Sequence, residues 1–150
     1  MKGWLLDTNV IAELVSPRGD ARVQAWAAAQ DGQWLFISIL TLAEYDKGIE
    51  NLPQDDLRRT SFAALRDGIG TRLQGRILPV ADTVARRWGS ISGTVKRETG
   101  HPPSVVDTLP AATALENDLI LATRNIGDVA FSGALVFNPR TVDPAKIPVG

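Results

Sequence analysis

Short apolar runs that end in polar residues are the feature that most limits how this chain can fold. The first run, Trp4–Leu6, is followed at once by Asp7, Thr8 and Asn9. A strand buried on both faces of a parallel sheet has such a continuous apolar sequence. The carboxyl ends of parallel strands face the crevice in which open α/β sheets bind ligands. Asp7 is therefore predicted at the mouth of a site. A purely capping role at the start of the next helix is the competing interpretation.

Runs like the first alternate with helical patterns along the chain. Further strands are predicted over 34–37, 77–80, 119–122 and 134–137, and helices over 10–15, 20–29, 41–51, 55–73, 82–98 and 104–117. This alternation is typical of a parallel sheet with helices on both faces. We therefore expect a three-layer α/β fold with a central, mostly parallel sheet of four to five strands. The last dozen residues are proline-rich and are expected to form a loose tail.

Composition excludes several classes of protein. The chain has 150 residues, 44% of them hydrophobic and 22% charged, which is ordinary for one globular domain, here expected over 1–150. It has no cysteine for disulfides or thiolate metal sites, and its single histidine, His101, rules out a multi-histidine zinc site in one chain. No apolar run approaches the roughly 18 residues that span a membrane, and the N-terminus does not resemble a secretory signal. We expect a soluble, cytoplasmic protein.

The basic residues are unevenly distributed, although the net charge is only −1. Residues 58–97 contain nine basic side chains against two acidic ones. Such a stretch can mark a binding site for an anionic partner. A solvated helix face is the alternative that we favour.

Four acids are predicted to meet at the carboxyl edge of the sheet. Asp7 follows the first strand and Asp128 the fourth, whereas Glu44 and Asp107 lie early in helices. Asp107 is surrounded in sequence by apolar residues and should be partly buried, which is costly for an unpaired charge. A salt bridge from Asp107 to Arg124 is the competing explanation.

Several carboxylates cannot share a small site while all are ionised. Two negative charges about 4 Å apart repel by roughly 4 kcal/mol at an effective dielectric constant of about 20. Either some of them hold protons or a cation neutralises them. Oxygen ligands without histidine or cysteine favour Mg²⁺ or Mn²⁺ over zinc or copper. Such a site can activate water and hold the phosphate that the water attacks, which predicts metal-dependent phosphodiester hydrolysis.

Four motifs occur in order along the chain: LLDTN at 5–9, SILTLAE at 38–44, VD at 106–107 with AATA at 111–114, and TRNIGD at 123–128. Over residues 3–138 the chain thereby resembles PIN-domain proteins, specifically the FitB-like branch of the VapC toxins of prokaryotic toxin–antitoxin pairs. The resemblance implies a PIN-like fold. It assigns the catalytic and metal-binding acids to Asp7, Glu44, Asp107 and Asp128. It assigns supporting polar roles to Thr8, Asn9, Ser38, Thr123 and Asn125.

The resemblance also implies an activity and partners. It predicts a Mg²⁺-dependent ribonuclease toxin, with Mn²⁺ able to substitute, that hydrolyses RNA and is inhibited by a cognate antitoxin protein. It further implies a homodimer, a larger toxin–antitoxin assembly on operator DNA, and no membrane partner. One alternative is a metal-holding binding module that acts mainly in a DNA-bound repressor complex with little turnover. Another is a DNA-directed structure-specific nuclease, which the small size of the chain disfavours.

Two residues depart from the family pattern. Pro110 stands where an aliphatic residue is usual, inside a predicted helix. Because proline lacks an N–H and its ring clashes with the carbonyl four residues earlier, a bend or a late helix start is predicted. We expect neighbouring turns to absorb it and Asp107 to keep its place; a bend that re-aims the Asp107 carboxylate or widens the site is the alternative. Val129 stands where the family usually has an aromatic residue, which concerns packing more than chemistry. His101, between glycine and proline, is expected to be an ordinary loop residue.

Overall fold

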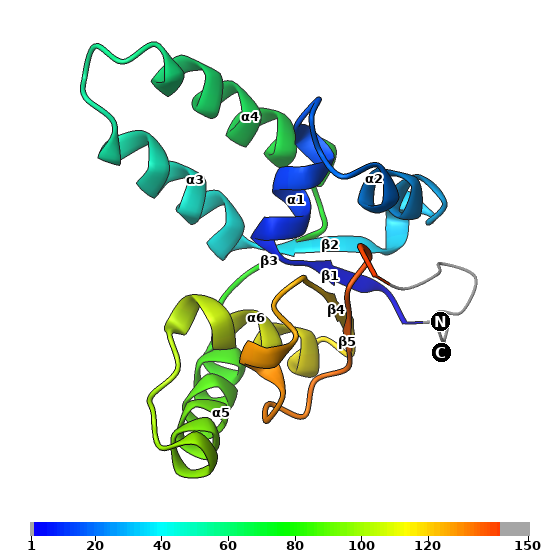
Figure 1. Ribbon diagram of the computed structural model, residues 1–150, viewed down its shortest axis with the longest axis vertical. Coiled ribbons are helices and arrows are strands. Elements are labelled where there is room, and N and C mark those ends of the chain that lie inside the picture. The colour runs from blue at the N-terminus through cyan, green and yellow to red at the C-terminus, as the bar shows by residue number, and fades with distance from the viewer. Residues whose placement is uncertain (1, 142–150) are drawn as a thin grey trace.

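A five-stranded parallel sheet forms the centre of the molecule in the computed structural model, which describes residues 2–141 (Figure 1). The strands lie in the order β3-β2-β1-β4-β5 and every neighbouring pair is parallel. Their bounds are β1 (Trp4–Leu6), β2 (Leu35–Ser38), β3 (Ile77–Leu78), β4 (Ile120–Ala122) and β5 (Val136–Phe137). The α/β expectation is confirmed. The predicted loose tail lies, from residue 142 onward, outside the described residues.

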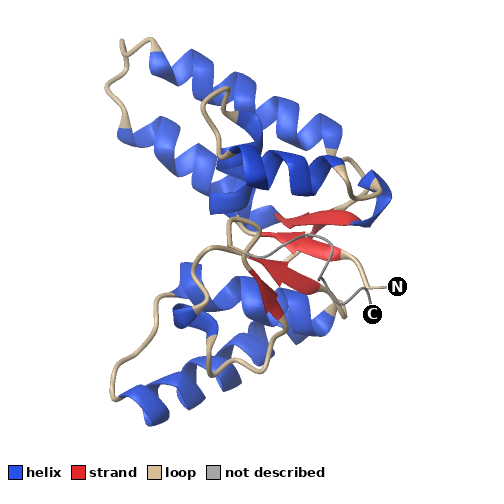
Figure 2. Ribbon diagram, turned by 45° about the vertical axis from the view of Figure 1, so that its right-hand side comes forward, coloured by secondary structure: helices blue, strands red, loops and turns tan. Residues whose placement is uncertain are grey.

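Helices cover both faces of the sheet (Figure 2). On one side lie α1 (Thr8–Val15), α2 (Ala21–Ala28), α3 (Ile39–Asn51) and α4 (Arg58–Arg72), and on the other lie α5 (Asp82–Thr99) and α6 (Val105–Glu116). Two 3₁₀ turns, η1 (Gly32–Trp34) and η2 (Gly127–Val129), complete the described elements. Helices α3 and α4 pack together as a hairpin that projects beyond the sheet (Figure 1). None of the helices in residues 2–141 is both long and apolar enough to span a bilayer.

Polar residues at the strand ends start the following helices earlier than the hydrophobic pattern predicts. Asp7 accepts a hydrogen bond from the backbone N–H of Thr8 (2.8 Å), so α1 begins directly after β1. Ser38 accepts one from the backbone N–H of Leu40 (3.0 Å), so α3 begins directly after β2. Such side-chain acceptors satisfy N–H groups that the first helical turn leaves free. Trp34, predicted in the second strand, belongs to η1 instead.

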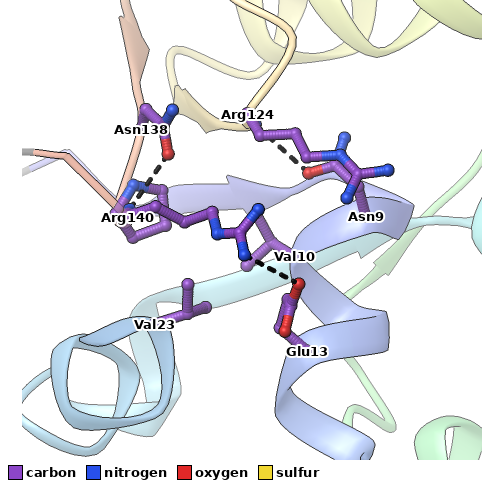
Figure 3. Close-up of a pocket in the computed structure, with 8 residues that line it drawn as sticks. Asn9, Val10, Glu13, Val23, Arg124, Asn138 and Arg140 are labelled. Carbon is purple, nitrogen blue, oxygen red and sulfur yellow. Dashed lines mark hydrogen bonds and ion pairs between the residues drawn. The ribbon is translucent and has the colours of Figure 1, made fainter. Parts of the chain in front are cut away.

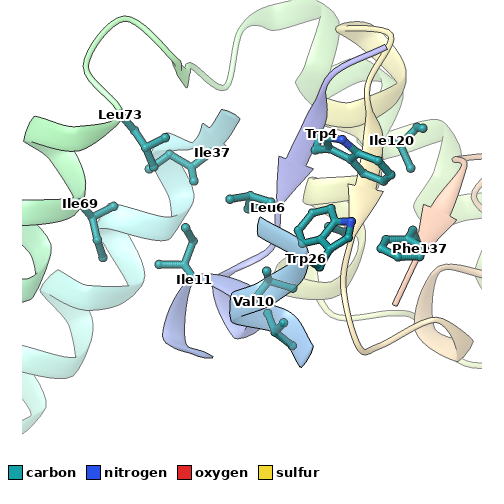
Figure 4. Packing of buried hydrophobic residues seen from close by; sticks show 12 residues of the cluster. Trp4, Leu6, Val10, Ile11, Trp26, Ile37, Ile69, Leu73, Ile120 and Phe137 are labelled. Atoms are coloured by element: carbon teal, nitrogen blue, oxygen red, sulfur yellow. The ribbon is translucent and has the colours of Figure 1, made fainter. Parts of the chain in front are cut away.

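The side chains of β1 alternate between two hydrophobic cores. Trp4 and Leu6 point into the core under α1, α2 and α4, and Leu5 points into the core under α5 and α6. In the first core, Trp4 packs edge-on against Trp26, with ring centroids 5.0 Å apart, and both contact Phe137 (Figure 4). Burying each large apolar side chain stabilises the fold by roughly 1.5–3 kcal/mol. Because β1 is held from both faces, the residue at its end is rigidly placed.

The strand order reverses between β1 and β4. The chain builds β2 and β3 on one side of β1, then returns to add β4 and β5 on the other. In α/β sheets this reversal opens a crevice at the carboxyl ends of the two strands, where ligands bind. Asp7 follows β1 and Thr123 follows β4, so both residues border this crevice.

Candidate active site

Asp7 lies at the centre of a hydrogen-bonded network in this crevice. Its Oδ1 accepts from the backbone N–H of Thr8 (2.8 Å). Its Oδ2 accepts from the hydroxyl of Thr123 (2.8 Å) and from the side-chain amide of Asn9 (3.1 Å). The Asn9 amide also donates to the Thr123 hydroxyl (3.1 Å). Asp7 therefore caps α1 and also borders the crevice, so capping is not its only structural role, and its role in a functional site stays a prediction.

Three of the predicted acids influence one another electrostatically. Burial raises the pKa of the Asp7 carboxyl, hydrogen bonds from Thr123 and Thr8 oppose that rise, and the charge of Asp107 adds to it. Burial also raises the pKa of Glu44; the Thr8 hydroxyl opposes this rise, and the charges of Asp7 and Asp107 add to it. The fold thus gathers carboxylates that are far apart in sequence. A cation among them would relieve their repulsion.

Glu44 reaches the site from the first half of α3, where it is half-buried. Thr41, one turn earlier on the same helix, is buried and its hydroxyl shares a 2.9 Å hydrogen bond with the hydroxyl of Thr8. This contact joins α3 to α1 beside the acids. Thr41 was not among the predicted site residues. Its spacing of three from Glu44, which places both on one helix face, is the signal that could have identified it.

Asp107 is held at the start of α6 by Ser104, the N-cap residue. The Ser104 hydroxyl donates to Asp107 Oδ2 (2.6 Å) and accepts from the Asp107 backbone N–H (3.2 Å). Asp107 is half-buried, as predicted, but it forms no ion pair with Arg124, so that competing explanation is wrong. Sequence reasoning missed Ser104, although a serine three residues before an acid is the spacing of a capping box.

Ser38 and Pro110 lie beneath Asp7. All three line a cavity of about 10 Å³, enough for about one water molecule. Ser38 is buried and also caps α3. Helix α6 begins at Val105 and continues through Pro110, so the late helix start does not occur. Pro110 is thus a buried neighbour of the candidate site.

Two further predicted residues follow β4. The backbone N–H of Asn125 donates to the hydroxyl of Thr123 (3.1 Å), which fixes the oxygen that holds Asp7. The backbone of Asp128 lies in η2, but its side chain lies outside the described part of the structure. The proposed role of Asp128 therefore stays a prediction.

The donors available to a metal are carboxylate and hydroxyl oxygens. Within the described side chains, no three histidine, aspartate or glutamate residues lie close enough to enclose a metal ion. His101 is exposed in the loop after α5. Mg²⁺ retains several waters and needs only one or two direct carboxylates. The oxygen chemistry around Asp7 therefore fits Mg²⁺ or Mn²⁺ rather than zinc.

A mainly apolar groove opens beside the acids. Its volume is about 280 Å³, and its lining residues come from α1, α3 and α4: Thr8, Ala12, Glu44, Tyr45, Gly48 and Phe62. Thr8 and Glu44 belong both to this groove and to the acid network. A ligand in the groove would therefore reach the acids.

The basic stretch 58–97 does not form one basic surface. Its residues lie mainly on α4 and α5, which cover opposite faces of the sheet (Figure 2). Most are engaged with acids: Arg58 with Asp56, Arg59 with Glu50, Arg66 with Asp46 and Asp67, Arg87 with Glu116, and Arg97 with Glu98. This arrangement supports the interpretation as solvated helix faces.

Known proteins resemble this chain in both sequence and fold. Residues 4–128 match the protein family described as PIN domain. Toxin FitB of Neisseria gonorrhoeae is 33% identical over 135 residues, which cover 90% of this chain and 96% of that protein. VapC ribonuclease Y4jK of Sinorhizobium fredii is 33% identical over 136 residues, with the same coverage. A solved structure of FitAB bound to an IR36 DNA fragment has a TM-score of 0.81 at 31% identity, covering 93% of this chain and 97% of that one.

Proposed function

Because this chain belongs to the PIN domain family, we propose that it is the toxin of a type II toxin–antitoxin pair and acts as a metal-dependent endoribonuclease. Its similarity to Toxin FitB and to a VapC ribonuclease supports the toxin and nuclease assignments. The observation that carries the proposal is Asp7, hydrogen-bonded at the crevice and coupled electrostatically to Glu44 and Asp107.

In this proposal Asp7, Glu44, Asp107 and Asp128 hold Mg²⁺, for which Mn²⁺ can substitute. A bound divalent cation supplies positive charge at the phosphate and makes the attacking water more acidic. Thr8, Asn9 and Thr123 keep the Asp7 carboxylate in a fixed orientation, because each donates a hydrogen bond to it. Preorganised ligands avoid the cost of reorganisation during the reaction.

Glu44 is the acid best suited to accept the proton of the attacking water. In the metal-free protein, burial and the charges of Asp7 and Asp107 raise the pKa of Glu44, so its carboxylate takes up a proton more readily. The water oxygen then bonds to phosphorus while the bond from phosphorus to the ribose oxygen breaks, and that ribose oxygen takes up a proton from solvent. The role of Ser104 is to orient Asp107 through its 2.6 Å hydrogen bond.

The partner of this toxin is a cognate antitoxin. We place an antitoxin segment in the groove beside the acids, with apolar side chains against Ala12, Tyr45 and Phe62. An arginine at the end of that segment would reach Glu44, which lines the groove, and would pair bidentately with the acids. This arrangement would displace the metal and explain inhibition. The homodimer and the assembly on operator DNA stay predictions; the DNA-bound FitAB structure supports the latter.

Expression in a bacterial host tests the proposed function. The wild-type chain should arrest growth, and Asp107→Asn should not, because it removes a proposed ligand while preserving shape. Asp55→Asn is the matched control, since Asp55 is exposed in the loop before α4. Co-expression of the small protein encoded beside the gene should restore growth.

Equal arrest by the wild type and Asp107→Asn would refute the enzymatic assignment. The binding-module alternative predicts that the wild type, with its antitoxin, represses an operator while RNA stays intact. Measuring RNA integrity in the arrested cells separates these outcomes.

A further inference from the structure

Arg124 is an exposed arginine beside the acid network with no partner for its guanidinium in the described structure. Eight of the twelve arginines form an ion pair or donate a side-chain hydrogen bond: Arg22, Arg58, Arg59, Arg66, Arg76, Arg87, Arg97 and Arg140. The other four, Arg18, Arg72, Arg86 and Arg124, do neither with any described side chain or carbonyl. Of these four, only Arg124 adjoins the hydrogen bonds that hold Asp7.

The backbone of Arg124 is part of this network. Its N–H donates to the side-chain carbonyl of Asn9 (3.2 Å), and the amide of the same Asn9 donates to Asp7 (3.1 Å). The preceding residue, Thr123, donates to Asp7 as well. The base of the Arg124 side chain is therefore fixed relative to the Asp7 carboxylate.

The guanidinium of Arg124 lies alongside Asn9 at the start of α1 (Figure 3). Arg140, which lines the same small pocket, reaches α1 and pairs with Glu13 (Figure 3), and it also pairs with Asp20. Two arginines next to each other thus differ in role. Arg140 ties the chain after β5 to α1 and α2, whereas Arg124 lies exposed beside Asn9, which holds Asp7.

A polyanion that enters an acidic crevice needs cations outside the acids themselves. Without a counter-charge, the carboxylates of Asp7, Glu44 and Asp107 repel every phosphate on either side of the one that is cleaved. The planar guanidinium of arginine binds phosphate oxygens bidentately. Contacts of this kind set the position of the strand without reading its sequence.

We propose that Arg124 is a positioning residue that binds a backbone phosphate of the RNA next to the scissile one. This inference rests on the proposed ribonuclease function. Because Arg124 is joined through Asn9 to Asp7, the phosphate that it binds sets the distance of the strand from the acids.

Salt-dependent RNA binding tests the proposal. A labelled single-stranded RNA oligonucleotide is titrated with Asp107→Asn protein in EDTA, where neither turnover nor a bridging metal contributes. Adding Arg124→Gln should weaken binding several-fold at low salt. It should also reduce the slope of log K against log[salt] by about 0.7, the share of one phosphate contact with single-stranded RNA. Arg124→Lys should keep the slope and recover only part of the affinity, because lysine retains the positive charge but cannot bind phosphate bidentately as the planar guanidinium does.

Arg86→Gln is the matched control. Arg86 is exposed on α5, equally without a described partner, and lies on the other side of the sheet from α1. The Arg86→Gln substitution should leave the affinity for RNA and the slope of log K against log[salt] unchanged. In the otherwise wild-type enzyme with Mg²⁺, Arg124→Gln should raise KM for RNA more than it lowers kcat.

An unchanged slope in Arg124→Gln, or an equal loss in Arg86→Gln, would overturn the assignment of Arg124. If the wild-type protein nevertheless cleaved RNA with Mg²⁺, the proposed ribonuclease function would stand without the assignment of Arg124. A reduced slope in Arg124→Gln with no cleavage by the wild type would support the phosphate contact and overturn the nuclease assignment instead.

Discussion

The hydroxyl of Thr123 donates a 2.8 Å hydrogen bond to the carboxylate of Asp7, although 116 positions separate the two residues in sequence. The bond forms because β1 and β4 are neighbours, with Leu6 paired to Ala122 in register. Each residue directly follows its strand, so the sheet itself brings the two side chains together. Substituting a residue that supports the acids, such as Thr123, should therefore alter the candidate site even when the acids themselves are kept.

Thr123→Val should impair cleavage while the protein stays folded. The substitution keeps the shape of the side chain but removes a buried donor to a carboxylate, a contact whose loss costs roughly 1.5–3 kcal/mol. Since this hydrogen bond lowers the pKa of Asp7, the acidic limb of the pH–rate profile should move to higher pH. Thr113→Val, which removes a buried hydroxyl bound to the Leu109 carbonyl in α6, is the matched control. Equal pH profiles for both variants would contradict this role of Thr123.

The stability of the metal-free protein should fall as pH rises through the folded-state pKa values of Asp7 and Glu44. For each of the two residues, the pKa in the folded state lies above the pKa in the unfolded chain. At a pH between the folded and unfolded pKa of a residue, the folded state therefore binds more protons than the unfolded state. The stabilisation is complete below the unfolded pKa and is lost above the folded one. Asp7→Asn and Glu44→Gln should therefore raise Tm at neutral pH in EDTA and flatten its pH dependence.

Asp56 provides a control of opposite sign. Hydrogen bonds from Arg58 lower the pKa of Asp56 to about 2, so its contribution is present at neutral pH and is lost as pH falls through that value. Asp56→Asn should thus lower Tm at neutral pH or leave it unchanged. A rise in Tm for Asp56→Asn equal to that for Glu44→Gln would show that carboxylate burial is not the cause.

Pro110→Ala should stabilise the fold without loss of cleavage. An interior helical proline costs about 3 kcal/mol relative to alanine. Losing two buried methylene groups costs about 1.6 kcal/mol, so a net gain of about 1 kcal/mol is expected. The new N–H can also pair with the Val106 carbonyl, which proline leaves without its helical donor. Thermal melting and cleavage are measured on the same sample. A more stable protein with little activity would show that Pro110, which lines the cavity beneath Asp7, shapes the site.

Gly48→Trp should weaken antitoxin binding and spare catalysis. Gly48 lines the groove, and a Cβ there meets no other atom within 4 Å, so a large side chain can fill the groove without displacing backbone. Gly89→Trp on α5, where a Cβ is equally free, gains the same helix propensity and serves as control. Affinity for the antitoxin is measured by calorimetry, alongside RNA cleavage. Unchanged affinity in Gly48→Trp would place the antitoxin elsewhere.

Much of the fold could be predicted because its strongest signals are local. The apolar run of β1 and the acid that follows it identified both the strand and the crevice. Helix starts were less predictable, since Ser38 both ends β2 and caps α3. The hydrogen-bond partner of Asp107 was not predicted: Ser104, within the same turn, holds it, and the competing salt bridge to Arg124 does not form.

The electrostatic character of the basic stretch could not be predicted from residues 58–97 alone. Several of its arginines pair with acids outside that stretch, including Arg59 with Glu50 and Arg87 with Glu116. Arg87 lies on α5 and Glu116 on α6, and only the packing of these helices makes the pair. The proposed role of Arg124 depends instead on where β4 ends in the fold. Its neighbours in sequence do not indicate that role.

RNA cleavage by the purified protein, with and without a divalent metal, tests the central claim most directly. We expect the wild type to cleave RNA in Mg²⁺ or Mn²⁺ and to stop in EDTA, and Asp107→Asn to be inactive under all three conditions. The same metals should raise Tm of the wild type more than that of Asp107→Asn. Cleavage that persists in EDTA and in Asp107→Asn, after contaminating nucleases are removed, would contradict a metal site built from these acids.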